Sequence, residues 1–167
     1  MLIIADSSPL HYLLLIGHID IVPTLYERII VPAIVIVELC HRRTPAIVRD
    51  WVEARPEWVD VQQPHLTASG SLAELDDGER DAILLAMELE ADLLLLDDRR
   101  ARVEATRQRL PTTGTLGVLQ AASRHDLLNL PEALSRLLET NFRVDQALID
   151  ALLARDAGRS GEPPSTV

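Results

Sequence analysis

The chain has little cysteine and few aromatic residues. Its 167 residues include one cysteine, Cys40, so an intrachain disulfide is excluded and a zinc site built on several cysteines is disfavoured. Aromatic residues make up 3% of the chain against 47% hydrophobic residues, so Leu, Ile, Val and Ala must build the core, as in buried parallel strands and helices. Cys40 follows Leu39 in an apolar stretch, and we expect it to be a buried small residue in a reducing cytoplasm.

The sequence also has no run that could span a membrane. Apolar runs such as Leu13–Ile16 and Leu93–Leu96 are far too short, and no basic segment precedes an apolar stretch near Met1. We therefore expect a cytoplasmic location and no membrane association. Neither GxGxxG nor GxxxxGK[ST] occurs, which disfavours a nucleotide-cofactor enzyme or an NTPase. The five histidines show no ligand spacing such as HExxH, and His11, close to Asp6, is the one of interest.

The charge balance is strongly acidic, with a formal net charge of −10. Such a protein repels phosphates, which argues against a nucleic-acid ligand. The argument weakens if several acids together hold a divalent metal ion, because the ion inverts the local field. The positive charge is also clustered, at Arg42-Arg43, at Arg99-Arg100, and at Arg102, Arg107 and Arg109.

Short apolar segments alternate with helical patterns along the whole chain. This alternation predicts an α/β fold, a three-layer sandwich with a central, mainly parallel sheet of four to five strands. We expect one domain over residues 1–156 and a disordered tail over 157–167, which is rich in Gly, Ser and Pro. Strands are expected at 2–5, 28–31, 58–61, 93–96 and 110–113, and a polar connection at 62–73.

Acidic residues follow two of these expected strands directly. Asp6 follows the first strand, and Asp97 and Asp98 follow the strand at 93–96. Ligands of open α/β sheets bind beyond the carboxyl ends of the strands, so these acids converge on one edge if the two strands are neighbours. Each acid also has a simpler explanation, because Asp6 suits a turn and Asp97 or Asp98 suits a helix cap.

Further acids lie within helices that are otherwise apolar. Glu38 lies in the middle of one, and Glu79 and Asp81 lie in another that is apolar nearly all round and should be largely buried. A buried carboxylate is costly unless it has a partner or a metal ion. The helix macrodipole alone would favour Asp76, Asp77 and Glu79 at the start of their helix. Capping explains single acids, but it does not readily explain all of them together.

A cluster of carboxylates has a defined chemistry. Hard oxygen ligands select Mg²⁺ or Mn²⁺, and one or two such ions can activate water and stabilise both oxygens of a phosphodiester exchange. Arg99, Arg100 and Arg102 lie next to the expected site and could bind phosphates, or they could form a solvated helix face.

Three motifs, in this order, are similar to those of PIN-domain nucleases. They are Ile4-Ala5-Asp6-Ser7-Ser8-Pro9-Leu10, Asp77-Gly78-Glu79-Arg80-Asp81-Ala82-Ile83, and Ala91-Asp92-Leu93-Leu94-Leu95-Leu96-Asp97-Asp98-Arg99-Arg100. The later stretch Thr113-Gly114-Thr115-Leu116-Gly117 also resembles a subgroup of uncharacterised VapC-type toxin relatives, and the likeness covers about residues 2–155.

The resemblance implies roles for individual residues. Its metal-binding and catalytic acids fall at Asp6, Glu38, Asp81 and Asp98, with Glu79 and Asp97 as further candidates for the metal site. Its substrate-orienting hydroxyls fall at Ser8, Thr113 and Thr115, beside Arg99 and Arg100 as phosphate ligands. The family implies Mg²⁺ or Mn²⁺, an RNA substrate, a homodimer and, for toxin members, an antitoxin protein.

The leading hypothesis is a divalent-metal-dependent ribonuclease that serves as the toxin of a toxin–antitoxin pair. Two alternatives remain open at this point. One is a catalytically inactive PIN-like binding module. The other is a haloacid-dehalogenase-type phosphatase, which also starts with an Asp after the first strand but would require a second Asp where this chain has Ser8.

Overall fold

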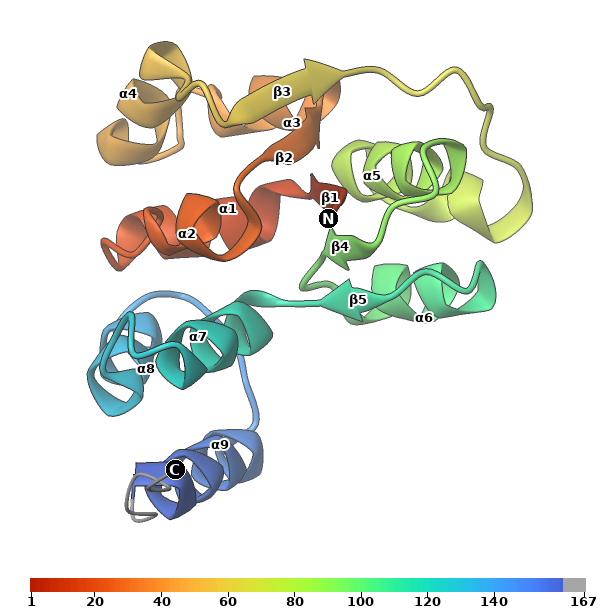
Figure 1. Ribbon diagram of the computed structural model, residues 1–167. Coiled ribbons are helices and arrows are strands. Elements are labelled where there is room, and N and C mark those ends of the chain that lie inside the picture. The colour runs from red at the N-terminus through yellow and green to blue at the C-terminus, as the bar shows by residue number, and fades with distance from the viewer. Residues whose placement is uncertain (161–167) are drawn as a thin grey trace.

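The computed structural model describes residues 1–160, and a five-stranded parallel sheet runs through its centre (Figure 1). The strand order is β3-β2-β1-β4-β5, and every neighbouring pair is parallel. This confirms the predicted α/β class and the parallel sheet. The strands are β1 (Ile3–Ala5), β2 (Ile29–Pro32), β3 (Val59–Gln62), β4 (Leu93–Leu95) and β5 (Thr112–Thr113).

The two faces of the sheet are buried by different sets of helices, because successive strand residues point to opposite faces. Ile3 and Ala5 belong to one hydrophobic cluster, whereas Ile4 between them belongs to the other. In the strand at 93–95, Leu95 belongs to the same cluster as Ile3, and Leu94 belongs to the same cluster as Ile4. Both faces of β1 and β4 are therefore apolar, which explains why these two strands appear in the sequence as continuous apolar runs.

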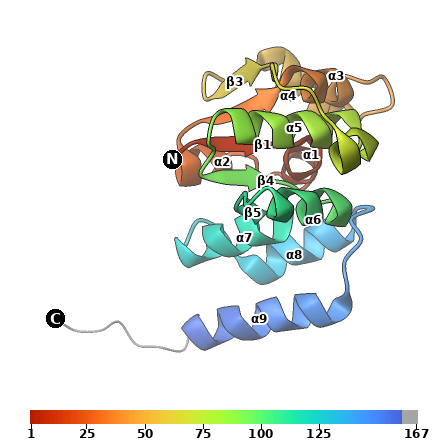
Figure 2. The ribbon, with the colours of Figure 1, turned by 90° about the vertical axis from the view of Figure 1, so that its right-hand side faces the viewer.

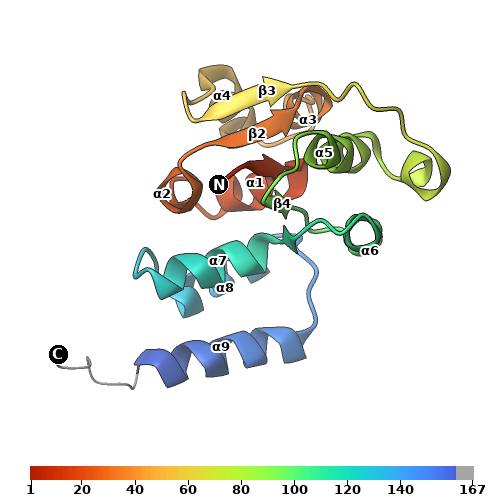
Figure 3. The same cartoon turned by 45° about the vertical axis from the view of Figure 1, so that its right-hand side comes forward.

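The helices form the two outer layers (Figures 2 and 3). Helices α5 (Asp77–Glu88) and α6 (Arg99–Arg107) cover one face, where they pack on the cluster that contains Ile4. The other cluster is covered by the remaining helices, α1 (Ser7–Leu15), α2 (Ile21–Tyr26), α3 (Ala33–Leu39), α4 (Ala46–Ala54), α7 (Thr115–Arg124), α8 (Leu130–Leu138) and α9 (Gln146–Ser160).

The connection between β3 and α5 is more ordered than the sequence predicted. Residues 62–73 were expected to be a polar connection, but a 3₁₀ helix, η1 (Gly70–Glu74), begins within it. The buried carboxylate of Glu104 accepts hydrogen bonds from Ser71 at 2.9 Å, Arg107 at 3.0 Å and Gln108 at 3.1 Å. The bond from Ser71 ties η1 to α6, and the bonds from Arg107 and Gln108, which lie at the end of α6 itself, hold the Glu104 carboxylate in place.

Two further expectations need correction. Helix α9 continues to Ser160, so residues 157–160 of the expected tail are helical, and residues 161–167 lie outside the described part. Cys40 is exposed rather than buried, because α3 ends at Leu39 and Cys40 is its C-cap residue. Among residues 1–160, no helix combines the length and the apolar character that crossing a bilayer requires.

The strand order places a topological switch between β1 and β4. The chain moves from β1 through β2 to β3 on one side and then returns to place β4 and β5 on the other side of β1. Ligands of open α/β sheets bind at such a switch, beyond the carboxyl ends of the strands. Ala5 pairs with Leu95 across the switch, and the backbone N–H of Asp6 donates to the carbonyl of Leu95 at 3.0 Å. The fold therefore directs attention to the residues that follow these two strands.

Candidate active site

Asp6 lies at the centre of the switch and is almost completely buried. Its residue is 2% exposed, and it stands at the N-cap position of α1. Burial raises the pKa of Asp6 to about 6, with smaller contributions from the charges of Glu38 and Asp97, while the backbone N–H groups of Ser7 and Ser8 oppose the shift. The chain thus keeps a carboxyl group in a dry position beside two other acids, which is unfavourable for folding alone.

Glu38 reaches the same region from the last turn of α3. Its Oε1 accepts a hydrogen bond from the backbone N–H of Gly78 at 3.0 Å, at the start of α5. A Cβ on Gly78 would lie 2.7 Å from Oε2 of Glu38, so the missing side chain gives this carboxylate its place. Glycine in the first turn of an otherwise strong helix is a signal that the sequence offered, because glycine weakens helices.

Asp97 and Asp98, the adjacent pair after β4, have different environments. Asp97 is half-buried, and its two oxygens accept hydrogen bonds from the backbone N–H and the hydroxyl of Thr115 at 2.7 and 2.6 Å. Burial raises the pKa of Asp97, whereas the bonds from Thr115 and the charge of Arg102 lower it. Asp98 is exposed and caps α6 by accepting from the N–H of Ala101 at 2.9 Å.

Helix α5 carries two candidate acids, Glu79 and Asp81, and Glu79 is electrostatically coupled to Asp6. Burial raises the pKa of Glu79 to about 7, and the charges of Asp98, Asp6 and Asp76 raise it further, so Glu79 lies within electrostatic reach of all three. Residues two apart on a helix point about 200° from each other, so one helix cannot direct both side chains to the same site.

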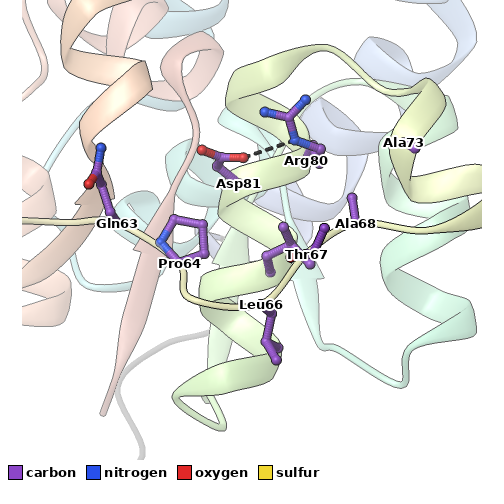
Figure 4. A pocket seen from close by; sticks show the side chains of 9 residues that line it. Gln63, Pro64, Leu66, Thr67, Ala68, Ala73, Arg80 and Asp81 are labelled. Carbon is purple, nitrogen blue, oxygen red and sulfur yellow. Dashed lines mark hydrogen bonds and ion pairs between the residues drawn. The ribbon is translucent and has the colours of Figure 1, made fainter.

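Asp81 instead lines a separate cavity. Its Oδ1 accepts from Nε of Arg80 at 3.0 Å, and Figure 4 shows this pair beside the segment that contains Pro64 and Thr67. The cavity has a volume of about 490 Å³. Asp81 therefore stays a predicted member of the acid cluster whose observed partner is Arg80, and Glu79 is the acid of α5 with electrostatic coupling to Asp6. A neighbouring Arg also gives Asp81 the partner that a half-buried carboxylate needs.

The expected phosphate ligands, Arg99 and Arg100, line one cavity together, and Arg99 also lines a second cavity beside Asp97. Arg99 lines a cavity of about 260 Å³ together with Asp97, Arg102 and Thr112. Arg100 points elsewhere and pairs with Glu74 at 3.7 Å, with both side chains 73% exposed. Arg102, which the structure brings to Asp97, is consequently a better candidate than Arg100 for contact with a substrate at this edge.

The expected hydroxyl residues also occupy different positions. Thr115 is fully buried and binds Asp97, so it orients an acid and does not face a ligand. Thr113 is half-buried, and its Oγ1 contacts Gly117 so closely that a Cβ there would clash. Ser8 lines a cavity of about 160 Å³ between α1 and α3, together with Glu38, His11 and Tyr12. Sequence reasoning had not considered Tyr12, although it lies one turn after Ser8 on the same helix.

The donor set suits a hard divalent cation in its chemistry. Five acids gather at this edge, and within residues 1–160 none of them forms an ion pair with an arginine. In the described part of the chain no three acidic, histidine or cysteine side chains converge closely enough to enclose an ion directly. Repulsion and the bonds to Gly78, Thr115 and Ala101 hold the carboxylates apart. Mg²⁺ fits such an open set because it keeps several of its waters when it binds to proteins. The five acids are Asp6, Glu38, Glu79, Asp97 and Asp98.

Comparisons with known proteins identify the family of the chain. A family model described as a PIN domain matches residues 2–157. Among solved structures, the chain is similar to a PilT N-terminus domain protein from the hyperthermophilic archaeon Sulfolobus solfataricus P2. That likeness has 15% identity and a TM-score of 0.49, and it covers 87% of this chain and 100% of that one. No curated protein sequence matches the chain. Because the family model spans nearly the whole described domain, the chain belongs to the PIN-domain family, whose members are generally nucleases.

Proposed function

We propose that this protein is a divalent-metal-dependent ribonuclease that hydrolyses RNA phosphodiester bonds. The observation that carries the proposal is the carboxyl group of Asp6 at the switch point, which is 2% exposed and whose pKa is raised to about 6 chiefly by burial and further by the charges of Glu38 and Asp97. A fold keeps such a repulsive arrangement at a cost in stability, and a bound cation would remove that cost. Membership of the PIN-domain family supports the same reading.

The residues of the cluster divide into those that would hold the ion and those that would orient them. Asp6, Glu38, Glu79, Asp97 and Asp98 would hold Mg²⁺ or Mn²⁺, directly or through water. When bound, the ion supplies activation of a water molecule and neutralises charge on the phosphodiester. Gly78 and Thr115 fix the orientation of two of these acids through the hydrogen bonds described above. Arg99 and Arg102, beside Asp97, would bind a phosphate of the substrate.

The test compares Asp6→Asn with wild type on a fluorescent single-stranded RNA, with Mg²⁺, with Mn²⁺ and with EDTA. Asn has the shape of Asp without its charge, so we expect cleavage to fall at least 100-fold while circular dichroism shows an intact fold. EDTA should abolish cleavage by wild type, and added Mn²⁺ should restore it. Full activity of a folded Asp6→Asn variant would refute the proposal.

A non-enzymatic binding module is the second candidate, and it is favoured by the separation of the carboxylates in the described chain. A Mn²⁺ titration followed by calorimetry discriminates between the two. Binding in the micromolar to millimolar range, lost in Asp6→Asn, supports the nuclease, and no binding supports the module. The phosphatase alternative is weaker, because the position two residues after Asp6 is a serine whose side chain lines a neighbouring cavity.

We further propose that the chain acts as the toxin of a toxin–antitoxin pair and forms a homodimer. The family supports this idea, and a ribonuclease without a partner would threaten the cell that makes it. Expression of wild type should arrest growth, whereas Asp6→Asn should not. A small protein encoded beside this gene should relieve the arrest when it is expressed with the toxin. Analytical ultracentrifugation of the purified chain tests the dimer.

A further inference from the structure

One face of α1 lies beside the acids and has no part in the chemistry proposed above. Ser7 and Ser8 are each four residues before His11 and Tyr12, respectively, so the two pairs share one side of the helix. The opposite side, with Pro9, Leu10, Leu13 and Leu14, is buried in the core. The shared side opens into the cavity of about 160 Å³, whose far wall is formed by Glu38, Leu39 and Thr44. A small concave site therefore adjoins the acid cluster.

Aromatic rings are concentrated at this site although they are scarce in the chain. The ring of Tyr12 meets His11 edge to face, with centroids 5.3 Å apart, and Phe142 in the same manner at 4.8 Å. The Tyr12 hydroxyl donates to Oδ1 of Asn141 at 3.3 Å. His11 and Tyr12 are each only partly buried. The rings are thus held by the segment between α8 and α9, and they keep faces or edges accessible to a ligand.

The lining of the cavity favours an uncharged occupant over a phosphate. The cavity is lined by the rings of His11 and Tyr12, by hydroxyls and by the carboxylate of Glu38, which repels a phosphate. Burial also lowers the pKa of His11, which favours the neutral imidazole. Rings and hydroxyls suit a flat, uncharged heterocycle with hydrogen-bonding edges.

We propose that this cavity binds a nucleobase of single-stranded RNA, stacked on the ring of His11 with its edge toward the perpendicular ring of Tyr12, next to the phosphate that is cleaved. The inference rests on the proposed ribonuclease function and adds a base-binding subsite to it. Single-stranded bases are commonly recognised by stacking on Tyr, Phe or His. A base within a duplex is held in its own stack and cannot enter such a cavity. The protein should consequently cleave single strands and spare paired RNA.

A double-mutant cycle between the side chain and the base tests the proposal. The substrate is a short RNA with one cleaved bond, prepared intact and with a single abasic nucleotide on either side of that bond. We expect His11→Ala to lower kcat/KM for the intact RNA about 5- to 100-fold, which is the range of one lost stacking contact. His11→Phe should keep most of the activity. His18→Ala, at the other end of α1, is the matched control and should match wild type.

The cycle gives a different result for stacking and for a structural role. If His11 stacks on a base, removal of that base should lower the kcat/KM of wild type as much as His11→Ala does. The kcat/KM of His11→Ala should then fall no further on the abasic RNA. If the losses of kcat/KM from His11→Ala and from the abasic nucleotide multiply at both positions, the subsite is overturned, while the proposed ribonuclease function is unaffected. Absence of cleavage of every RNA by wild type refutes the ribonuclease, and the subsite with it. Mn²⁺ affinity is measured in parallel, and an equal loss of affinity in His11→Ala would also overturn the subsite.

Discussion

Replacement of Asp6 by Asn should stabilise the metal-free protein although it abolishes the proposed activity. Asp6 is 2% exposed, and burial with the charges of Glu38 and Asp97 raises its pKa from 3.8 to about 6. A raised pKa means that the folded state binds a proton more tightly than the unfolded state does. Ionisation of Asp6 is therefore a cost of folding, and Asn removes the charge while it keeps one acceptor oxygen for the start of α1.

The size and the pH range of the effect follow from the two pKa values. A shift of about 2 units corresponds to about 3 kcal/mol at most, since one unit is worth about 1.4 kcal/mol. The pKa of Asp6 is higher in the folded state than in the unfolded state, so protonation of Asp6 stabilises the fold. Stability from the protonated group is complete below pH 3.8 and is lost as pH rises through about 6. The difference between Asp6→Asn and wild type should be near zero at pH 4 and largest at pH 8.

Thermal denaturation at pH 4, 6 and 8 with EDTA measures this difference. At pH 8 the variant should unfold at a Tm higher by up to about 6–12 °C, given about 2–4 °C per kcal/mol for a chain of this size. Saturating Mn²⁺ should stabilise wild type and have little effect on the variant, so that the gap shrinks or reverses. A variant less stable than wild type at pH 8, or a difference that does not change with pH, would refute the reasoning.

Three other changes test the site. Glu79→Gln should lower the rate of RNA cleavage at least tenfold in a kinetic assay, whereas Asp81→Asn on the same helix should stay within about twofold of wild type. A larger loss in Asp81→Asn than in Glu79→Gln would place Asp81 in the acid cluster. Gly78→Ala should displace the carboxylate of Glu38, because its Cβ would lie 2.7 Å from Oε2 of that flexible side chain, and should weaken Mn²⁺ binding in calorimetry with little loss of stability in urea unfolding, since alanine favours a helix over glycine; unchanged Mn²⁺ affinity would contradict the role of Glu38. Thr115→Val should weaken Mn²⁺ binding measured by calorimetry and Thr115→Ser should restore it, since the hydroxyl bond of 2.6 Å is kept only in Ser; equal affinity in both would count against the orienting role.

Much of the fold follows from local patterns in the sequence. Continuous apolar runs such as Leu93–Leu96 between helical segments can be satisfied only by a sheet that is covered on both faces, so the parallel α/β class was predictable. Short-range signals also placed Asp6 after the first strand and Asp97 after the fourth. Boundaries were less predictable, because Cys40 and residues 157–160 depend on where a helix ends, and few local signals fix that point.

The membership of the site, by contrast, was decided by the tertiary structure. Glu79 and Asp81 are alike in sequence and share one helix, and only the docking of α5 on the sheet determines which of them faces Asp6. The adjacent Asp97 and Asp98 have different hydrogen-bond partners for a similar reason. Thr115 follows β5 and reaches only Asp97, which leaves Asp98 to cap α6. Composition and periodicity specify which elements form, but the rotation of each helix depends on packing against partners distant in the sequence.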